Sequence, residues 1–166
     1  MHKQVQSAPG SESETVTCDV DVLNSLLRGE VAAGNAYDMV IAKFDGRPEA
    51  IELHRIRDEH AEAAAVVRER IRHFGGEPAE KAGIWGKLTA AITGTAKLLG
   101  PATALGTLRQ GEEYGIGQYE NILADPSVDS DDKDLIRYRL LPRCHSHVAD
   151  LDRMIGAIEK ESNGTS

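Results

Sequence analysis

The sequence is poor in aromatic residues and cysteine, and it contains no long hydrophobic run. Aromatic residues make up only 4% of the 166 residues, so a core has to be built from Leu, Ile, Val and Ala. The two cysteines, Cys18 and Cys144, are too few for a disulfide framework and favour a reduced, cytoplasmic protein. No segment approaches the roughly 18 uncharged apolar residues that a membrane span requires, so we do not expect a membrane protein.

Positive charge is in the minority. The chain has 19 Lys plus Arg against 27 Asp plus Glu, which leaves a formal net charge of −8. Proteins that bind nucleic acid usually present a basic face, so we expect no nucleic-acid partner. A hydrophobic content of 40% and a charged content of 28% are typical of a single globular domain.

The two ends of the sequence lack any apolar periodicity. Residues 1–18 are rich in Ser, Glu and Gln and contain no hydrophobic stretch of the kind found in signal peptides. Residues 161–166 are also polar. We therefore expect disordered tails on both sides of one domain that spans residues 19–160.

Within this domain, apolar residues recur at steps of three and four in four segments. This period predicts helices at about 19–44, 48–74, 101–124 and 131–160, the last with Ser130 as its N-cap. No segment shows the two-residue alternation of a strand. The sequence therefore predicts an all-α protein.

The lengths of the connections predict the topology. The first two helices are joined by a few residues, and so are the last two, which predicts two antiparallel hairpins. The crossover at 75–100 is much longer than the usual loop between bundle neighbours and can run the length of the molecule. Two hairpins with one long crossover are typical of a ferritin-like four-helix bundle.

The crossover has an apolar pattern of its own, formed by Trp85, Leu88, Ile92 and Leu99. We expect a short amphipathic helix that packs over the bundle. A membrane-surface helix is the alternative, because the segment also carries the lysines Lys81, Lys87 and Lys97.

Each predicted helix carries one ionisable residue where its apolar stripe calls for a core residue. These residues are Glu30, His60, Glu112 and His147. An unpaired buried charge is costly, so such groups need partners or a bound ion. Carboxylates and imidazoles suit iron, manganese and zinc, so the pattern predicts a divalent metal site in the core, with iron or manganese as the expected ion.

Other interpretations of these positions remain open. The two glutamates can form buried salt bridges with Arg57 or Arg109, and the two histidines can form hydrogen bonds with the same glutamates. The result would be a structural polar network without a metal. Conversely, the acidic neighbours can supply a second metal position if the helices rotate slightly; they are Asp58, Glu59 and Glu113.

Three further residues lie close to these positions in the pattern. Cys144 lies three residues before His147, which is a ligand spacing but has no second pair to complete a zinc ribbon. Tyr37 and Tyr119 fit the apolar stripes, and we expect them to pack in the core.

Long stretches of the chain resemble a bacterial family of ferritin-like four-helix-bundle proteins that is classified as a domain of unknown function. The resemblance lies in the following segments: LNSLLRGE (23–30) with Tyr37, IRDEHAEAA (56–64), FGGEP (74–78), GIWG (83–86), AKLLG (96–100), LRQGEEYGIGQYENIL (108–123) and LIRYRLLPRCHSHVADLDRM (135–154). The resemblance implies a ferritin-like bundle and leaves the activity open.

The resemblance extends only in part to the di-iron proteins of the ferritin-like superfamily. In those proteins two helices each supply a Glu, and two others each supply Glu-x-x-His. Glu30, His60, Glu112 and His147 match this pattern, but Arg57 and Cys144 stand where it has its remaining two glutamates. These departures argue against a full di-iron centre.

The sequence therefore predicts a ferritin-like protein that binds a divalent metal. With iron, the expected chemistry is oxidation or sequestration of ferrous ion in stress or metal handling. The alternative is a non-enzymatic structural or interaction module with a polar core network. We expect a homo-oligomer, most simply a dimer, because ferritin-like hairpins often pair.

Overall fold

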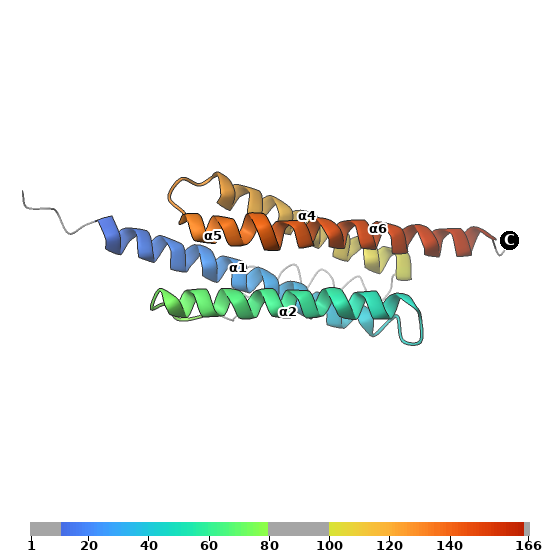
Figure 1. Cartoon of the computed structure of the whole chain (residues 1–166). Helices are drawn as coiled ribbons and strands as arrows, with labels where there is room; N and C mark the ends of the chain where they lie inside the picture. Colours follow the sequence, from blue (N-terminus) through green and yellow to red (C-terminus); the bar gives the residue numbers. More distant parts are fainter. Residues whose placement is uncertain (1–10, 80–99, 165–166) are drawn as a thin grey trace, which may run out of the picture.

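The computed structural model describes residues 11–79 and 100–164, and in these ranges the protein is all-α, as predicted (Figure 1). Two long helices, α1 (Ser11–Ile41) and α2 (Glu49–His73), form the first half. The second half contains α4 (Pro101–Ala124) and a further helical column, which is made of the segments α5 (Ser130–Leu135), η2 (Ile136–Leu140) and α6 (Leu141–Gly164).

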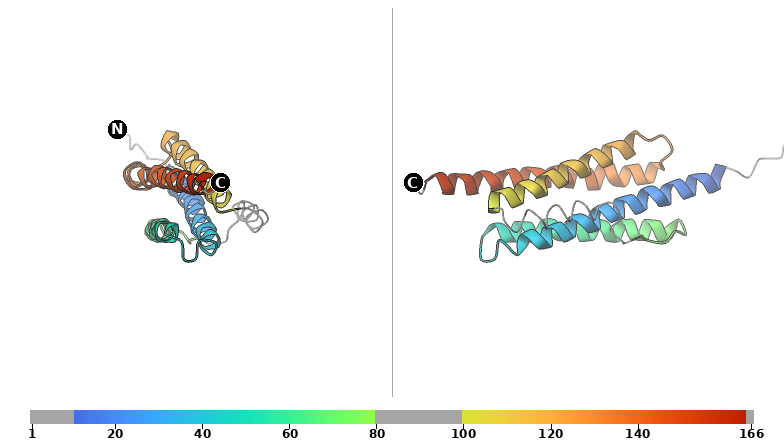
Figure 2. Two further views of the ribbon diagram at one scale, coloured as in Figure 1. Left: turned by 90° about the vertical axis from the view of Figure 1, so that its right-hand side faces the viewer. Right: turned by 180° about the vertical axis from the view of Figure 1, so that it is seen from behind.

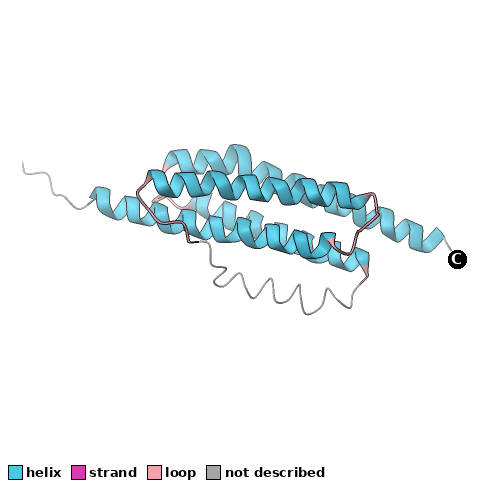
Figure 3. Ribbon diagram, turned by 90° about the horizontal axis from the view of Figure 1, so that it is seen from below, coloured by secondary structure: helices cyan, strands magenta, loops and turns pink. Residues whose placement is uncertain are grey.

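The helices pack lengthwise in two hairpins. α1 packs along α2, and α4 packs along α6, with each pair antiparallel (Figures 1 and 2). Contacts between α1 and α4, and between α2 and α6, join the hairpins. α2 and α4 run in the same direction (Figure 1), as expected from a long crossover between them. Figure 3 shows the packed helices from below. The predicted crossover helix at 85–99 lies outside the described residues.

Both outer helices are longer than the sequence predicted. α1 begins at Ser11, although residues 1–18 were expected to be a disordered tail, and α6 continues to Gly164, past the predicted end at 160. Once a helix is nucleated, each added residue contributes another hydrogen bond, so a packed segment can extend the helix into polar sequence. Neither end carries the Gly or Pro that would stop it earlier.

The start and the middle of the last helical column also differ from the prediction. Asp129, not Ser130, caps α5, because its Oδ1 accepts a hydrogen bond of 2.8 Å from the backbone N–H of Asp131. The column then widens into the π-helical turn η2. Pro142 is the second residue after this turn; it has no N–H and its ring displaces the carbonyl four residues earlier, within η2, which a π turn accommodates.

The interior consists of two apolar clusters with a polar layer between them. The first cluster contains Tyr37, Val40, Phe44, Leu53, Ile56, Leu105, Leu108, Leu151, Met154 and Ile158. The second contains Leu23, Leu26, Leu27, Val67, Ile71, Tyr119, Ile136 and Leu140. On each long helix, the ionisable residue that interrupts the stripe lies between residues of these two clusters.

Candidate metal centre

The structure brings together all four residues singled out from the sequence. Glu30 on α1, His60 on α2, Glu112 on α4 and His147 on α6 are all buried, with at most 7% of each residue exposed. They occupy the layer between the two apolar clusters, largely out of reach of bulk solvent. Each must therefore be paired within the protein or with a bound ion.

His60 bridges the two glutamates. Its Nδ1 lies 2.8 Å from Glu30 Oε2, and its Nε2 lies 3.0 Å from Glu112 Oε1. A carboxylate can only accept a hydrogen bond, so both ring nitrogens donate and the imidazole carries a positive charge in this arrangement. His60 thus acts as an internal cation between two buried anions.

The pKa values of this bridge follow from that pairing. Burial favours the neutral imidazole, but hydrogen bonds and negative charge from Glu112 and Glu30 outweigh it and raise the pKa of His60 to about 10. Burial also favours the neutral form of Glu112, but the hydrogen bonds and charges of His147 and His60 hold its pKa well below its ordinary value. The cluster therefore stabilises ionised partners at neutral pH.

His147 joins the same carboxylate from the other side. Its Nδ1 lies 3.4 Å from Glu112 Oε2, and its Nε2 lies 2.9 Å from Glu59 Oε2. The rings of His60 and His147 are neighbours, with centroids 5.1 Å apart. Each histidine thus has one nitrogen toward Glu112 and the other toward an outer carboxylate, which is Glu30 for His60 and Glu59 for His147.

Both buried tyrosines belong to this network, which the sequence did not reveal. The hydroxyl of Tyr37 donates a 2.7 Å hydrogen bond to Glu112 Oε1, and the hydroxyl of Tyr119 donates to Glu30 Oε1. Burial and the neighbouring carboxylates raise the pKa of both phenols well above the usual value. Their positions on the apolar stripes predicted burial only; the hydrogen bonds depend on the pairing of helices.

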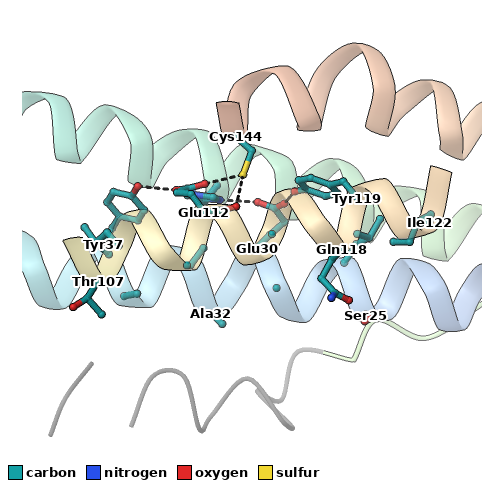
Figure 4. A pocket seen from close by; sticks show the side chains of 18 residues that line it. Ser25, Glu30, Ala32, Tyr37, Thr107, Glu112, Gln118, Tyr119, Ile122 and Cys144 are labelled. Atoms are coloured by element: carbon teal, nitrogen blue, oxygen red, sulfur yellow. Dashed lines mark hydrogen bonds and ion pairs between the residues drawn. The ribbon is translucent and has the colours of Figure 1, made fainter. Parts of the chain in front are cut away.

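Cys144 also contacts the cluster. Its Sγ donates to Glu112 Oε2 at 2.9 Å and lies 3.3 Å from the backbone carbonyl of Glu112 (Figure 4). Burial, together with the charge of Glu112, raises the pKa of the thiol. Cys144 and His147 are three residues apart and therefore share a face of α6.

The predicted arginine partners lie elsewhere. Arg57 contacts Asp38 at 3.0 Å and Asp58 at 2.8 Å, and Arg109 contacts Asp152 at 2.6 Å. The interpretation of Glu30 and Glu112 as partners of these arginines is therefore wrong. Arg57 lies only three residues before His60, but its side chain is on the solvent side of α2, whereas His60 faces the core.

Of the acidic residues next to the cluster positions in the sequence, one contacts the cluster and two lie at the surface. Glu59 reaches the cluster through His147 and also pairs with Arg55. Hydrogen bonds to these two residues outweigh its burial and lower the pKa of Glu59. Asp58 and Glu113 are exposed and pair with surface arginines, so they do not take part in the cluster.

Two cavities border the cluster. One of about 70 Å³ lies between α1 and α4; Glu30, Glu112 and Tyr37 are on its wall, and most of the remaining wall is made of Gly, Ala and Leu (Figure 4). A smaller one, of about 10 Å³, is lined by Glu30, Glu59, His60, Tyr119, Cys144 and His147, among others. The smaller cavity has room for about one water molecule.

The arrangement is suited to a metal ion. One ligand atom from each of His60, Glu112 and His147 lies within 4.8 Å of the others. Imidazole nitrogen and carboxylate oxygen are ligands of divalent transition metals. The buried His/Glu/His group can therefore hold such an ion when the ring nitrogens of His60 and His147 that face Glu112 carry no proton.

Comparison with known proteins places this all-α chain in a family. The model of a family described as Domain of unknown function (DUF2383) matches residues 19–125, and the chain belongs to this family. The match includes Glu30, His60 and Glu112; Cys144 and His147 lie beyond it. No curated protein and no solved structure matches the chain. Among the described residues, no helix is long and apolar enough to cross a membrane.

Proposed function

We propose that this protein binds one divalent transition-metal ion, iron or a related metal, through His60, Glu112 and His147 in a ferritin-like four-helix bundle. The main support for this proposal is that three different helices each direct one side chain of a metal-ligand type into the same buried layer. In this proposal Glu30, expected from the sequence to be a ligand, instead orients His60 through its Nδ1.

The pairing of each histidine supports this assignment. A histidine that binds a metal through one nitrogen commonly donates the other N–H to a carboxylate, which fixes the ring orientation and the tautomer. Glu30 lies 2.8 Å from Nδ1 of His60, and Glu59 lies 2.9 Å from Nε2 of His147. The remaining nitrogens both lie beside Glu112, where the ion would bind.

The ferritin-like arrangement is supported by chain direction. α2 and α4 run the same way, and they belong to two antiparallel hairpins (Figure 1). A four-helix bundle with one long crossover has this order. Where the di-iron pattern has its second pair of glutamates, however, this chain has the surface residue Arg57 and the thiol of Cys144. The proposal is therefore one ion per chain and not a di-iron centre.

A second candidate is a structural polar network that sets the register of the helices. It is favoured by one observation: each ring nitrogen of His60 and His147 faces a carboxylate that can serve as its partner. Buried polar networks can specify one packing of a bundle at some cost in stability. The same residues would then act by pairing alone.

Metal titration of the untagged, chelator-treated protein tests the two candidates. The metal site predicts about one equivalent of Fe²⁺, Mn²⁺ or Zn²⁺ after dialysis, with a melting temperature that rises as free metal increases. Below about a tenth of an equivalent of every metal tested, with no thermal shift, the metal proposal fails and the structural network stands.

Two histidine variants provide a matched comparison. His147→Gln removes a ligand from the buried layer, whereas His145→Gln changes an exposed histidine two residues away on the same helix. We expect metal binding to be lost in the first variant and kept in the second. Equal binding by both, with circular dichroism showing folded protein, would contradict the proposed ligand set.

A further inference from the structure

We propose that Cys144 is the fourth ligand of this ion, as a thiolate, so that the site takes a thiophilic tetrahedral metal such as Zn²⁺ or Co²⁺ in preference to Mn²⁺. This inference rests on the proposed metal site. It adds the residue that determines which metal the site selects.

The position of the sulfur carries the inference. Cys144 Sγ is 2.9 Å from Glu112 Oε2, the same oxygen that lies 3.4 Å from His147 Nδ1. The thiol of Cys144 and the imidazole of His147 thus contact the same carboxylate oxygen. Cys144, His147 and His60 also line the small cavity of about 10 Å³, which is large enough for a bare metal ion.

The charge of the direct ligands is compatible with a thiolate. The two neutral imidazoles and the Glu112 carboxylate would leave the ion and its ligands with a net charge of about +1, next to the buried carboxylate of Glu30. A thiolate from Cys144 makes the group of ion and ligands neutral. Glu30 is already committed to His60 and Tyr119, and Glu59 to His147 and Arg55.

The protons balance as follows. Cys144 releases its thiol proton, and each histidine binds the ion through the nitrogen that faces Glu112, so that a proton on this nitrogen of His60 or His147 is released as well. All of these protons go to solvent, and no electron is transferred. His60 keeps the proton on Nδ1 and donates it in a hydrogen bond to Glu30. The resulting donors are one sulfur, two nitrogens and one oxygen, a set that favours tetrahedral Zn²⁺, whereas Mn²⁺ prefers oxygen ligands.

Cobalt spectroscopy of the full chain tests this inference. Co²⁺ is added to the reduced, chelator-treated Cys18→Ser variant, in which Cys144 is the only remaining thiol. We expect visible bands of tetrahedral Co²⁺ together with a near-ultraviolet charge-transfer band from thiolate to metal. Cys144→Ser, with Cys18 intact, should lose the charge-transfer band.

Metal selectivity gives a second readout that a purely structural cysteine would not change. Removing an outer partner of a metal ligand already costs 10–100-fold in affinity, so Cys144→Ser should weaken Zn²⁺ binding by about 100-fold or more. Mn²⁺ binding should change by much less. A variant that is merely less well folded would weaken both metals equally, and that result would overturn the inference.

The remaining outcomes separate the inference from the proposed function. If Co²⁺ binds to the Cys18→Ser variant without a charge-transfer band, Cys144 is not a ligand, while the metal site of His60, Glu112 and His147 stands. If neither Co²⁺, Zn²⁺, Fe²⁺ nor Mn²⁺ binds, the proposed function fails and the inference fails with it.

Discussion

His60 on α2 and Glu112 on α4 form a buried ion pair, with 3.0 Å between Nε2 and Oε1, although 52 positions separate them in the chain. α2 and α4 belong to different hairpins, so this pair links the two halves of the molecule across the polar layer. Because both side chains are buried, the loss of one partner leaves the other without compensation.

Glu112→Gln should therefore destabilise the metal-free protein strongly. Breaking a buried charged pair by removing one partner costs about 3–5 kcal/mol, and here two histidines, Tyr37 and Cys144 all lose an ionised acceptor. Urea unfolding at neutral pH, followed by circular dichroism in the presence of a chelator, measures the change.

The adjacent glutamate is the matched control. Glu113 is 47% exposed at its side chain and pairs with Arg109 one turn earlier. Glu113→Gln should change the free energy of unfolding by less than about 1 kcal/mol, because exposed ion pairs contribute little. Similar losses for the two variants would show that Glu112 is not held in a buried network.

The stability of the metal-free protein should fall as the pH rises from about 6.5 to about 10. The pKa of His60 is about 10 in the folded protein and about 6.5 in the unfolded chain, so the folded state holds the proton more tightly. The stabilisation is complete below the unfolded pKa and is lost as the pH approaches the folded one. We expect a change on the order of a few kcal/mol.

His60→Gln provides the comparison for that pH dependence. The variant cannot titrate at this position, so its free energy of unfolding should change much less between neutral pH and about pH 9.5. Chemical unfolding at several pH values in chelator gives both slopes. Parallel slopes for the two proteins would assign the alkaline loss to other groups.

Glu30→Gln and Glu59→Gln should weaken metal binding without abolishing it. Each carboxylate holds the outer nitrogen of one histidine, and the removal of such a partner typically costs 10–100-fold in affinity. Isothermal titration with Zn²⁺ measures the change. Glu62→Gln is the control, since its half-exposed carboxylate pairs with Arg139 and Arg143 on the surface. Unchanged affinity in all three variants would contradict the orienting role.

Two glycine substitutions should have opposite effects on stability. Gly75 follows α2 with φ +74°, a conformation that costs a residue with a Cβ about 1 kcal/mol or more, so Gly75→Ala should destabilise the protein. Gly117 lies inside α4 with open space where a Cβ would be. Gly117→Ala should stabilise it by about 0.5–1 kcal/mol. Thermal unfolding measures both, and a loss at Gly117 would indicate a close neighbour there.

The sequence by itself determined the helical class and the residues of the polar layer. Three- and four-residue periodicity follows from the geometry of a single helix, so the apolar stripes and their interruptions at Glu30, His60, Glu112 and His147 could be read from local sequence. The ends were less accurate: α1 starts at Ser11 and α5 is capped by Asp129, because fraying and capping depend on small energy differences. The predicted homodimer remains a prediction.

Only the tertiary structure decided which of these groups touch one another. Periodicity shows that a residue faces inward. It does not show how each helix is rotated about its axis or shifted along it relative to the other helices, and a shift of a few ångströms decides whether two side chains touch. Hence Arg57, three residues from His60, pairs at the surface, while Tyr119 and Cys144 enter the network. The packing of α1, α2, α4 and α6 against one another turned four buried polar residues into one connected cluster.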